Sequence, residues 1–162
     1  MLTDAAYALA VLRESDFVDS SRVGVAGASF GGELAVTLAA LQEDVAAIYF
    51  SGFGGHAGSY QFAAGGRDDQ PHYCHIIPGV KALMRREDMI LLLAPRPALG
   101  TRGEREGTPS DEFIRTAQGA WDVFDARDEF SYAVVPGGGH EFFSEEATKF
   151  FKQNLGDPDD AS

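Results

Sequence analysis

The sequence predicts a three-layer α/β/α fold built on a short parallel β-sheet. Segments typical of buried strands alternate along the chain with segments of helical periodicity, an order that favours right-handed crossover connections. The sequence Gly-Ala-Ser-Phe-Gly at 27–31 lies between such a strand and such a helix. A chain of 162 residues, 44% of them hydrophobic, is large enough for one core. We therefore expect a single partial domain over 1–155, followed by a flexible tail over 156–162.

The pattern of apolar residues predicts each element in turn. Helical spacing over 4–14 predicts a first helix, and the β-branched run at 23–26 predicts a strand buried on both faces. The elements expected after this strand alternate in the same way: a helix at 33–41, a strand at 45–50, a helical turn at 88–93, a strand at 98–101, a helix capped by Ser110 or Asp111, a strand at 130–135 and a closing helix at 144–155.

The segment 51–88 differs from the rest because it has no sustained periodicity and is rich in glycine, histidine and aromatic residues. Long irregular loops inside compact domains are often functional. We interpret this segment as an active-site loop, although its aromatic side chains can equally fill the core. Its candidates for substrate contact are Phe53, Tyr60, Tyr73 and His75.

Ser29 is the candidate nucleophile. A Gly-x-Ser-x-Gly sequence between a buried strand and a helix is typical of a nucleophile elbow, in which a sharp turn presents the serine at the edge of the sheet. A strand at 23–26 and a helix at 33–41 provide that context here. In this geometry the backbone N–H of Phe30, the next residue, is expected to stabilise the oxyanion.

A serine hydroxyl is a weak nucleophile until a base accepts its proton, so the hypothesis requires a histidine. His140 follows the last predicted strand in a glycine-rich loop, which places it at the same sheet edge as Ser29. The other three histidines, His56, His72 and His75, lie in the irregular segment. We interpret these three as loop residues rather than metal ligands, and we predict no metal and no cofactor.

The base needs a carboxylate that fixes its tautomer. In an elbow-type hydrolase this acid follows the strand after the long insertion, which corresponds to the acidic segment 103–107. We choose Glu106, with Glu104 and Asp111 as alternatives.

The composition limits the possible partners. The formal net charge is −12, and such a surface repels nucleic acid and anionic lipid. No apolar run is long enough to cross a membrane and no signal peptide is visible, so a cytoplasmic location is favoured, unless an upstream segment precedes Met1. The single Cys74 excludes an intrachain disulfide. We expect a small-molecule substrate, without nucleic acid or membrane as partners.

Four segments of the sequence, VDSSRVGVAGASFGG, CHIIPG, LLLAPRPALGTRGERE and VVPGGGHEFF, resemble α/β-hydrolases of the dienelactone hydrolase and acetyl xylan esterase-like group. The resemblance implies a serine esterase acting on short acyl groups such as acetyl esters of carbohydrates. It implies Ser29, Glu106 and His140 as the catalytic residues, with glutamate where the family usually has aspartate. It also implies an eight-stranded fold of which this chain is the C-terminal half.

Two other functions share these features. A prolyl oligopeptidase-type serine peptidase has the same catalytic half, and a catalytically silent fragment keeps the same fold. If the chain has only four strands, the strand at 23–26 lies at a sheet edge, where unpaired backbone groups invite pairing with another strand. We therefore expect a second copy, forming a homodimer, or a missing N-terminal half to cover that edge.

Overall fold

The computed structural model describes residues 1–55, 83–84 and 86–156. Its longer elements, in chain order, are α1 (Leu2–Arg13), β1 (Gly24–Ala28), α2 (Phe30–Leu41), β2 (Ala47–Ser51), the 3-10 helix η5 (Arg86–Leu93), β3 (Ala98–Gly103), α3 (Asp111–Asp122), β4 (Phe130–Val135) and α4 (Ser144–Leu155). Within these described ranges, three short 3-10 helices accompany them: η1 (Ser20–Arg22), η6 (Glu104–Glu106) and η7 (Arg127–Glu129).

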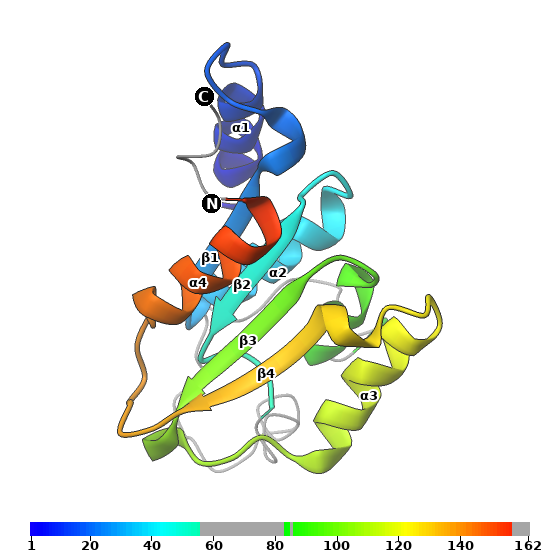
Figure 1. Ribbon diagram of the computed structural model, residues 1–162, viewed down its shortest axis with the longest axis vertical. Helices are drawn as coiled ribbons and strands as arrows, with labels where there is room; N and C mark the ends of the chain where they lie inside the picture. The colour runs from blue at the N-terminus through cyan, green and yellow to red at the C-terminus, as the bar shows by residue number, and fades with distance from the viewer. Residues whose placement is uncertain (56–82, 85, 157–162) are drawn as a thin grey trace.

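The four strands form one parallel sheet in the order β1-β2-β3-β4 (Figure 1). Ala28 is in register with Ser51, and Ser51 is in register with Thr101, so three strands end at nearly the same level. Loops that follow these strands therefore meet at one edge of the sheet, the usual position of sites in parallel α/β folds.

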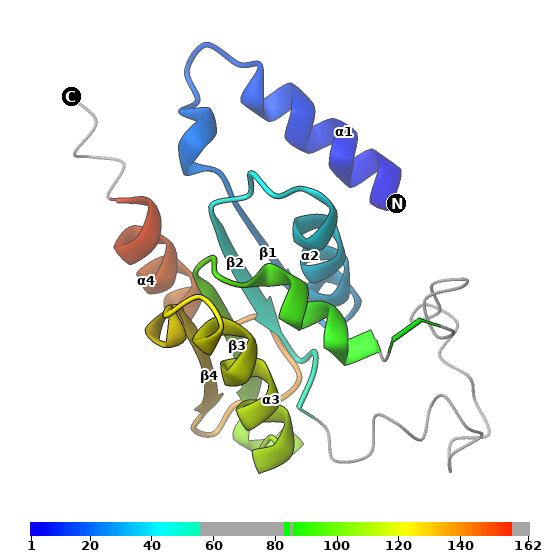
Figure 2. The ribbon, with the colours of Figure 1, turned by 90° about the vertical axis from the view of Figure 1, so that its right-hand side faces the viewer.

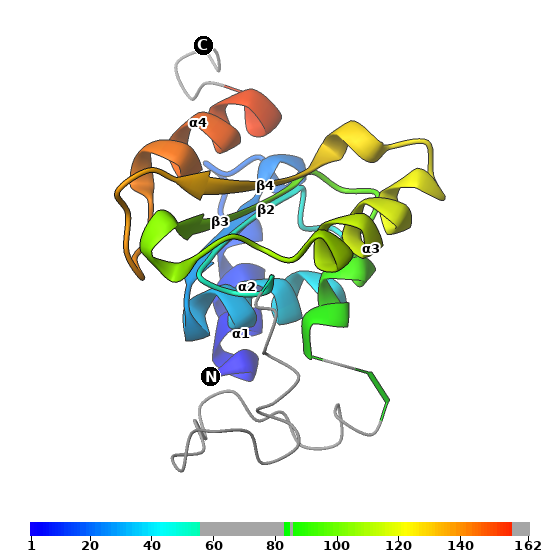
Figure 3. The ribbon, with the colours of Figure 1, turned by 90° about the horizontal axis from the view of Figure 1, so that it is seen from below.

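Helices cover both faces of the sheet, which confirms the predicted α/β class and its three layers. Figure 3 shows α4 on one side of the sheet and α1 with α2 on the other. The element α2 contacts β1 and β2, and α3 contacts β4 and η5. Residues of α2, η5 and α3, which lie between successive strands in the chain, pack in one hydrophobic cluster, as expected when the strand order advances in one direction through right-handed crossovers.

The strand β2 lies at the centre of the core, with all five of its residues buried. Successive side chains of β2 point to opposite faces of the sheet. Ile48 and Phe50 belong to the large cluster with Trp121 under α2, α3 and η5, whereas Tyr49 packs with Phe150 of α4. The hydrophobic run that predicted a buried strand is thus explained by apolar layers on both sides.

The element types agree with the sequence prediction, and the boundaries differ where turns are sharp. The strand β1 runs two residues beyond the predicted end, and α2 begins at Phe30 rather than at position 33, so no loop separates strand from helix. Ser110 caps α3 by accepting from the N–H of Phe113 at 3.2 Å. The predicted helical turn at 88–93 is the 3-10 helix η5. Most of the predicted loop 51–88 lies outside the described residues.

None of the described helices is both long and apolar enough to span a lipid bilayer.

Candidate active site

The structure places Ser29 in a strained turn between β1 and α2. Its backbone has φ 55° and ψ −120°, a conformation that non-glycine residues rarely adopt. Two hydrogen bonds hold the turn: the Ser29 N–H donates to the carbonyl of Ser51 at 2.8 Å, and the Ser29 carbonyl accepts from the N–H of Glu33 at 3.1 Å. The chain thus passes from a strand through a strained serine directly into a helix, which is the arrangement of a nucleophile elbow.

The turn is possible because Gly27 has no side chain. A Cβ at Gly27 would lie 2.0 Å from the carbonyl oxygen of Gly31, inside the first turn of α2. Glycine at the first position of the Gly-x-Ser-x-Gly motif thus lets the helix start directly against the strand that precedes it.

Glu106 and His140 lie together at the same edge of the sheet. Glu106 ends η6, directly after β3, and His140 lies in the loop after β4. Glu106 Oε1 is 2.6 Å from His140 Nδ1, and Glu106 Oε2 accepts from the N–H of Gly103 at 3.2 Å. The Glu106 side chain is only 11% exposed, against 52% for His140. When Nδ1 donates to this carboxylate, the imidazole keeps Nε2 as its proton acceptor.

The two alternative acids take other positions. The carboxylate of Glu104 accepts from the N–H of Gly137 at 2.9 Å, and Asp111 begins α3. The N–H of Arg105 also donates to the carbonyl of Gly138 at 3.1 Å. These bonds join η6 to the glycine-rich loop that precedes His140, so the Glu106–His140 pair rests on two connected segments.

Gly52 links His140 to the elbow. It follows Ser51, whose carbonyl holds the Ser29 N–H, and its φ is +61°. A Cβ built on Gly52 would lie 2.8 Å from His140 Cε1 and 3.0 Å from Nδ1, so the imidazole packs directly on the Gly52 backbone.

The side chains of Ser29 and His140 do not form a hydrogen bond with each other. Such bonds are often long in unliganded hydrolases and tighten when substrate is bound.

Phe30 is the first residue of α2, where the helix dipole favours negative charge. The role of its N–H as an oxyanion donor stays a prediction. Phe53 is 1% exposed and packs against Phe50 with ring centroids 6.3 Å apart, which favours the core-filling alternative for this residue. The other substrate-contact candidates, Tyr60, Tyr73 and His75, lie outside the described residues.

Tyr132 supports the turn that follows β2. Its hydroxyl donates to the carbonyls of Phe53 and Gly54 at 3.2 and 3.1 Å. Burial raises the pKa of Tyr132 well above that of an exposed tyrosine, so the hydroxyl stays protonated and remains a donor.

Sequence reasoning missed Ser51 and Gly52. The available signal was their position directly after a predicted strand that ends at the same sheet edge as the elbow.

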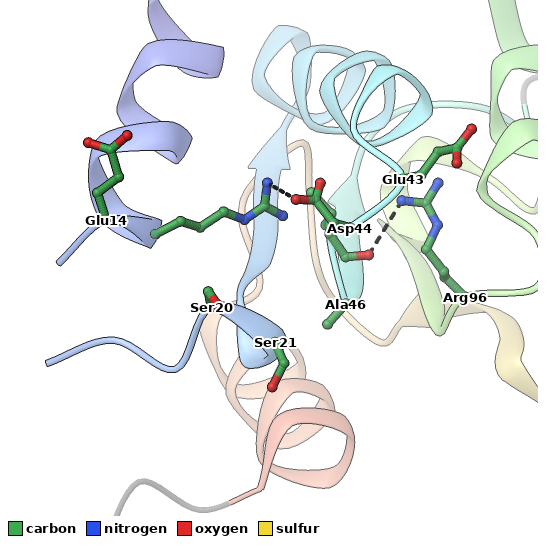
Figure 4. A pocket seen from close by; sticks show the side chains of 9 residues that line it. Glu14, Ser20, Ser21, Glu43, Asp44, Ala46 and Arg96 are labelled. Atoms are coloured by element: carbon green, nitrogen blue, oxygen red, sulfur yellow. Dashed lines mark hydrogen bonds and ion pairs between the residues drawn. The ribbon is translucent and has the colours of Figure 1, made fainter. Parts of the chain in front are cut away.

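A pocket of about 690 Å³ lies away from these residues, beside the segments that lead into β1 and β2 (Figure 4). Its lining includes Arg13, which pairs with Asp44 at 2.6 Å, and Arg96, which donates to the backbone carbonyl of Ala39 in α2. None of the candidate catalytic residues lines it.

Within the described ranges, no three histidine, cysteine, aspartate or glutamate side chains gather as a metal site.

Comparison with known proteins agrees with the resemblance expected from the sequence. The family model of acetyl xylan esterase matches residues 1–52, which include the elbow. No curated protein sequence matches the chain.

Several solved structures share the fold. A glucuronoyl esterase from Solibacter usitatus is 20% identical with a TM-score of 0.68, over 94% of this chain and 47% of that chain. A carbohydrate esterase family 15 glucuronoyl esterase from Caldicellulosiruptor kristjansonii is 19% identical with a TM-score of 0.70, over 95% and 49%. A recombinant glucuronoyl esterase from Sporotrichum thermophile is 17% identical with a TM-score of 0.68, over 95% of this chain and 51% of that chain.

These similarities confirm the predicted fold class and the resemblance to carbohydrate esterases. The chain spans about half the length of the solved structures that it matches. It is thus similar in fold to α/β-hydrolase esterases, with an acetyl xylan esterase match over its first 52 residues.

Proposed function

We propose that the chain carries the catalytic residues of a serine hydrolase that cleaves carboxylic esters of carbohydrates. The observation that carries this proposal is the strained backbone of Ser29 at the sheet edge where Glu106 is 2.6 Å from His140. Backbone strain of this kind is concentrated at functional sites. The similarity to acetyl xylan esterase and glucuronoyl esterases supports the same reaction class.

In the proposed reaction, Ser29 Oγ attacks the ester carbon while His140 Nε2 accepts the hydroxyl proton. Glu106, bonded to Nδ1, orients the ring and stabilises the imidazolium. The tetrahedral oxyanion collapses, the alcohol leaves with the proton from His140, and an acyl-Ser29 ester remains. Water, deprotonated by His140, then releases the acid and regenerates the serine.

The N–H of Phe30 is the proposed oxyanion donor in this chain. In elbow-type hydrolases a second donor comes from a loop near an earlier strand. The elbow strand β1 is the first strand among the described residues. Loss of one donor costs other enzymes about 100- to 1,000-fold in kcat, so we expect slow turnover by this chain alone.

For the substrate, we propose short acyl groups, with acetyl esters of sugars as the first candidates. The reason is that the acetyl xylan esterase model matches the segment containing Ser29. In an acetyl ester the sugar is the alcohol, whereas in a glucuronoyl ester it is the acyl group. Hydrolysis of an acetylated xylo-oligosaccharide, compared with that of a methyl glucuronate ester, separates the two classes.

An active-site fluorophosphonate probe tests the mechanism directly. We expect covalent labelling of the wild-type chain and none of Ser29→Ala, while the exposed variant Ser131→Ala is labelled like wild type. Turnover of p-nitrophenyl acetate should follow the same pattern. Absence of labelling in the wild-type chain would favour the catalytically silent alternative, and cleavage of a chromogenic peptide in preference to esters would favour the peptidase.

A further inference from the structure

Two hydroxyl groups of β2 hold the loop that carries His140. Ser51 Oγ donates to the carbonyl of Glu141, the residue after His140, at 2.6 Å. Tyr49 Oη donates to the carbonyl of Phe143 at 3.1 Å and is 2.8 Å from Thr101 Oγ1. These three hydroxyl residues are fully buried. Ser51 and Tyr49 point to the same face of the sheet because they are two residues apart on a strand.

Ser51 occupies a special position in this set because it bonds both to Ser29 and to Glu141, the residue next to His140. Its carbonyl accepts from the N–H of Ser29 at 2.8 Å, while its hydroxyl holds the residue beside His140. Ser51 therefore connects the elbow to the histidine loop through a single residue. Its neighbour Gly52 then forms the surface on which the imidazole lies.

We propose that Ser51 is the positioning residue that sets the distance between the base His140 and the nucleophile Ser29. This inference rests on the proposed esterase function, although the geometry it describes can be measured independently. Ser51 takes no part in bond making, because its hydroxyl proton is already donated to a backbone carbonyl. Small displacements of a catalytic group from its productive geometry can lower a rate about 100-fold. We therefore expect the two hydrogen bonds of Ser51, to Ser29 and to Glu141, to be important for kcat; together they are called the tether below.

The test compares Ser51→Ala with Thr37→Val. Both substitutions remove a buried hydroxyl that donates to a backbone carbonyl, and the Thr37 bond, to Glu33 at 2.7 Å, lies within α2. We expect Ser51→Ala to lower kcat on p-nitrophenyl acetate about 10- to 100-fold with KM changed less than about twofold. We expect both variants to have melting temperatures lowered by similar amounts. Thr37→Val should not show the loss of kcat that is expected for Ser51→Ala.

A second measurement keeps the tether separate from the enzymatic activity. In the wild-type chain, nuclear Overhauser spectra should show contact between the Gly52 α-protons and the His140 Hε1 proton, since a Gly52 Cβ would lie 2.8 Å from Cε1. Ser51→Ala should weaken or abolish this contact, and Thr37→Val should keep it. If Ser51→Ala keeps both the contact and the full kcat, the tether is wrong and the esterase function stands. If the wild type is inactive while Ser51→Ala still loses the contact, the esterase function fails and the tether stands.

Discussion

Glu106 is held through both of its carboxylate oxygens, one on His140 and one on the backbone of Gly103. We expect Glu106→Gln to keep the fold and to lower kcat by about 1,000- to 10,000-fold, because an amide no longer fixes the tautomer that leaves Nε2 as acceptor. Steady-state kinetics on p-nitrophenyl acetate measure this loss. Asp111→Asn, which changes the alternative acid at the start of α3, should stay within about twofold of wild type. The reverse order of effects would identify Asp111 as the acid.

Gly52 combines a positive φ with direct contact to the imidazole. We expect Gly52→Ala to destabilise the fold by about 1–3 kcal/mol and to abolish most activity, since its Cβ displaces His140. Gly156→Ala is the matched control: its φ is +79° at the end of α4, and its Cβ would meet the side chain of Arg22. Urea unfolding should show stability loss in both variants, and only Gly52→Ala should lose esterase activity. Equal activity of the two variants would show that His140 does not need this surface.

The candidate catalytic residues could be predicted from the sequence, whereas the residues that position them could not. Ser29, Glu106 and His140 each follow a predicted strand, and their side chains carry recognisable chemistry. Ser51 and Gly52 have no such signature. Their roles depend on where a loop 90 residues further along the chain meets β2, and only the folded backbone shows this.

At the scale of elements, Arg96 joins the C-terminal ends of α2 and η5. Its guanidinium donates to the carbonyls of Ala39 at 2.9 Å and Gln42 at 3.0 Å on one side, and to that of Leu93 at 3.1 Å on the other. Burial lowers the pKa of Arg96, yet an arginine remains charged at neutral pH. The last carbonyls of a helix have no intrahelical donors. Arg96 therefore donates hydrogen bonds to carbonyl oxygens that would otherwise lack a partner within their helix.

We therefore expect Arg96→Lys to lower the free energy of unfolding by about 2 kcal/mol, because an ammonium group cannot reach carbonyls in several directions. Chemical denaturation measures the change. Arg127→Lys, at an exposed arginine that pairs with Asp122, should cost less than about 1 kcal/mol. Similar losses from the two variants would mean that Arg96 is no more important than a surface ion pair.

The elements themselves were predictable in type and order because their hydrophobic periodicity is set by the layers that they contact. Their ends were less predictable. The immediate transition from β1 to α2 depends on the close approach at Gly27, and β3 continues to Gly103 because it pairs with β4 along its full length.

For the whole molecule, the main feature is the unpaired side of β1. Among the described residues this strand pairs only with β2. The helix α1, which packs against α2 (Figure 2), exposes Tyr7 to 70% and Val11 to 66%. An unpaired strand edge favours association with another strand, and exposed apolar side chains favour association with another surface. The partner expected from the sequence, a second copy or an N-terminal half, remains a prediction.

Light scattering after size-exclusion chromatography tests whether this side of β1 drives association. We expect the chain alone to form dimers or larger species, and Ala26→Lys, at an exposed position of β1, to shift it towards monomer because a lysine at a strand edge opposes pairing. Ser131→Lys introduces the same charge at an exposed position of β4, the opposite edge strand, and should leave the mass unchanged. A monomeric wild-type chain would contradict this expectation.

The placement of the three candidate catalytic residues after different strands also has a consequence for biosynthesis. The ribosome makes Ser29 about 110 residues before His140, and the loop that carries His140 takes its place at the sheet edge only once β4 has joined the sheet. Under the proposed mechanism, a nascent or prematurely terminated polypeptide therefore carries an inert hydroxyl. Hydrolytic capability then arises only when β4 is added to the sheet, so chains released before this strand is made do not hydrolyse esters.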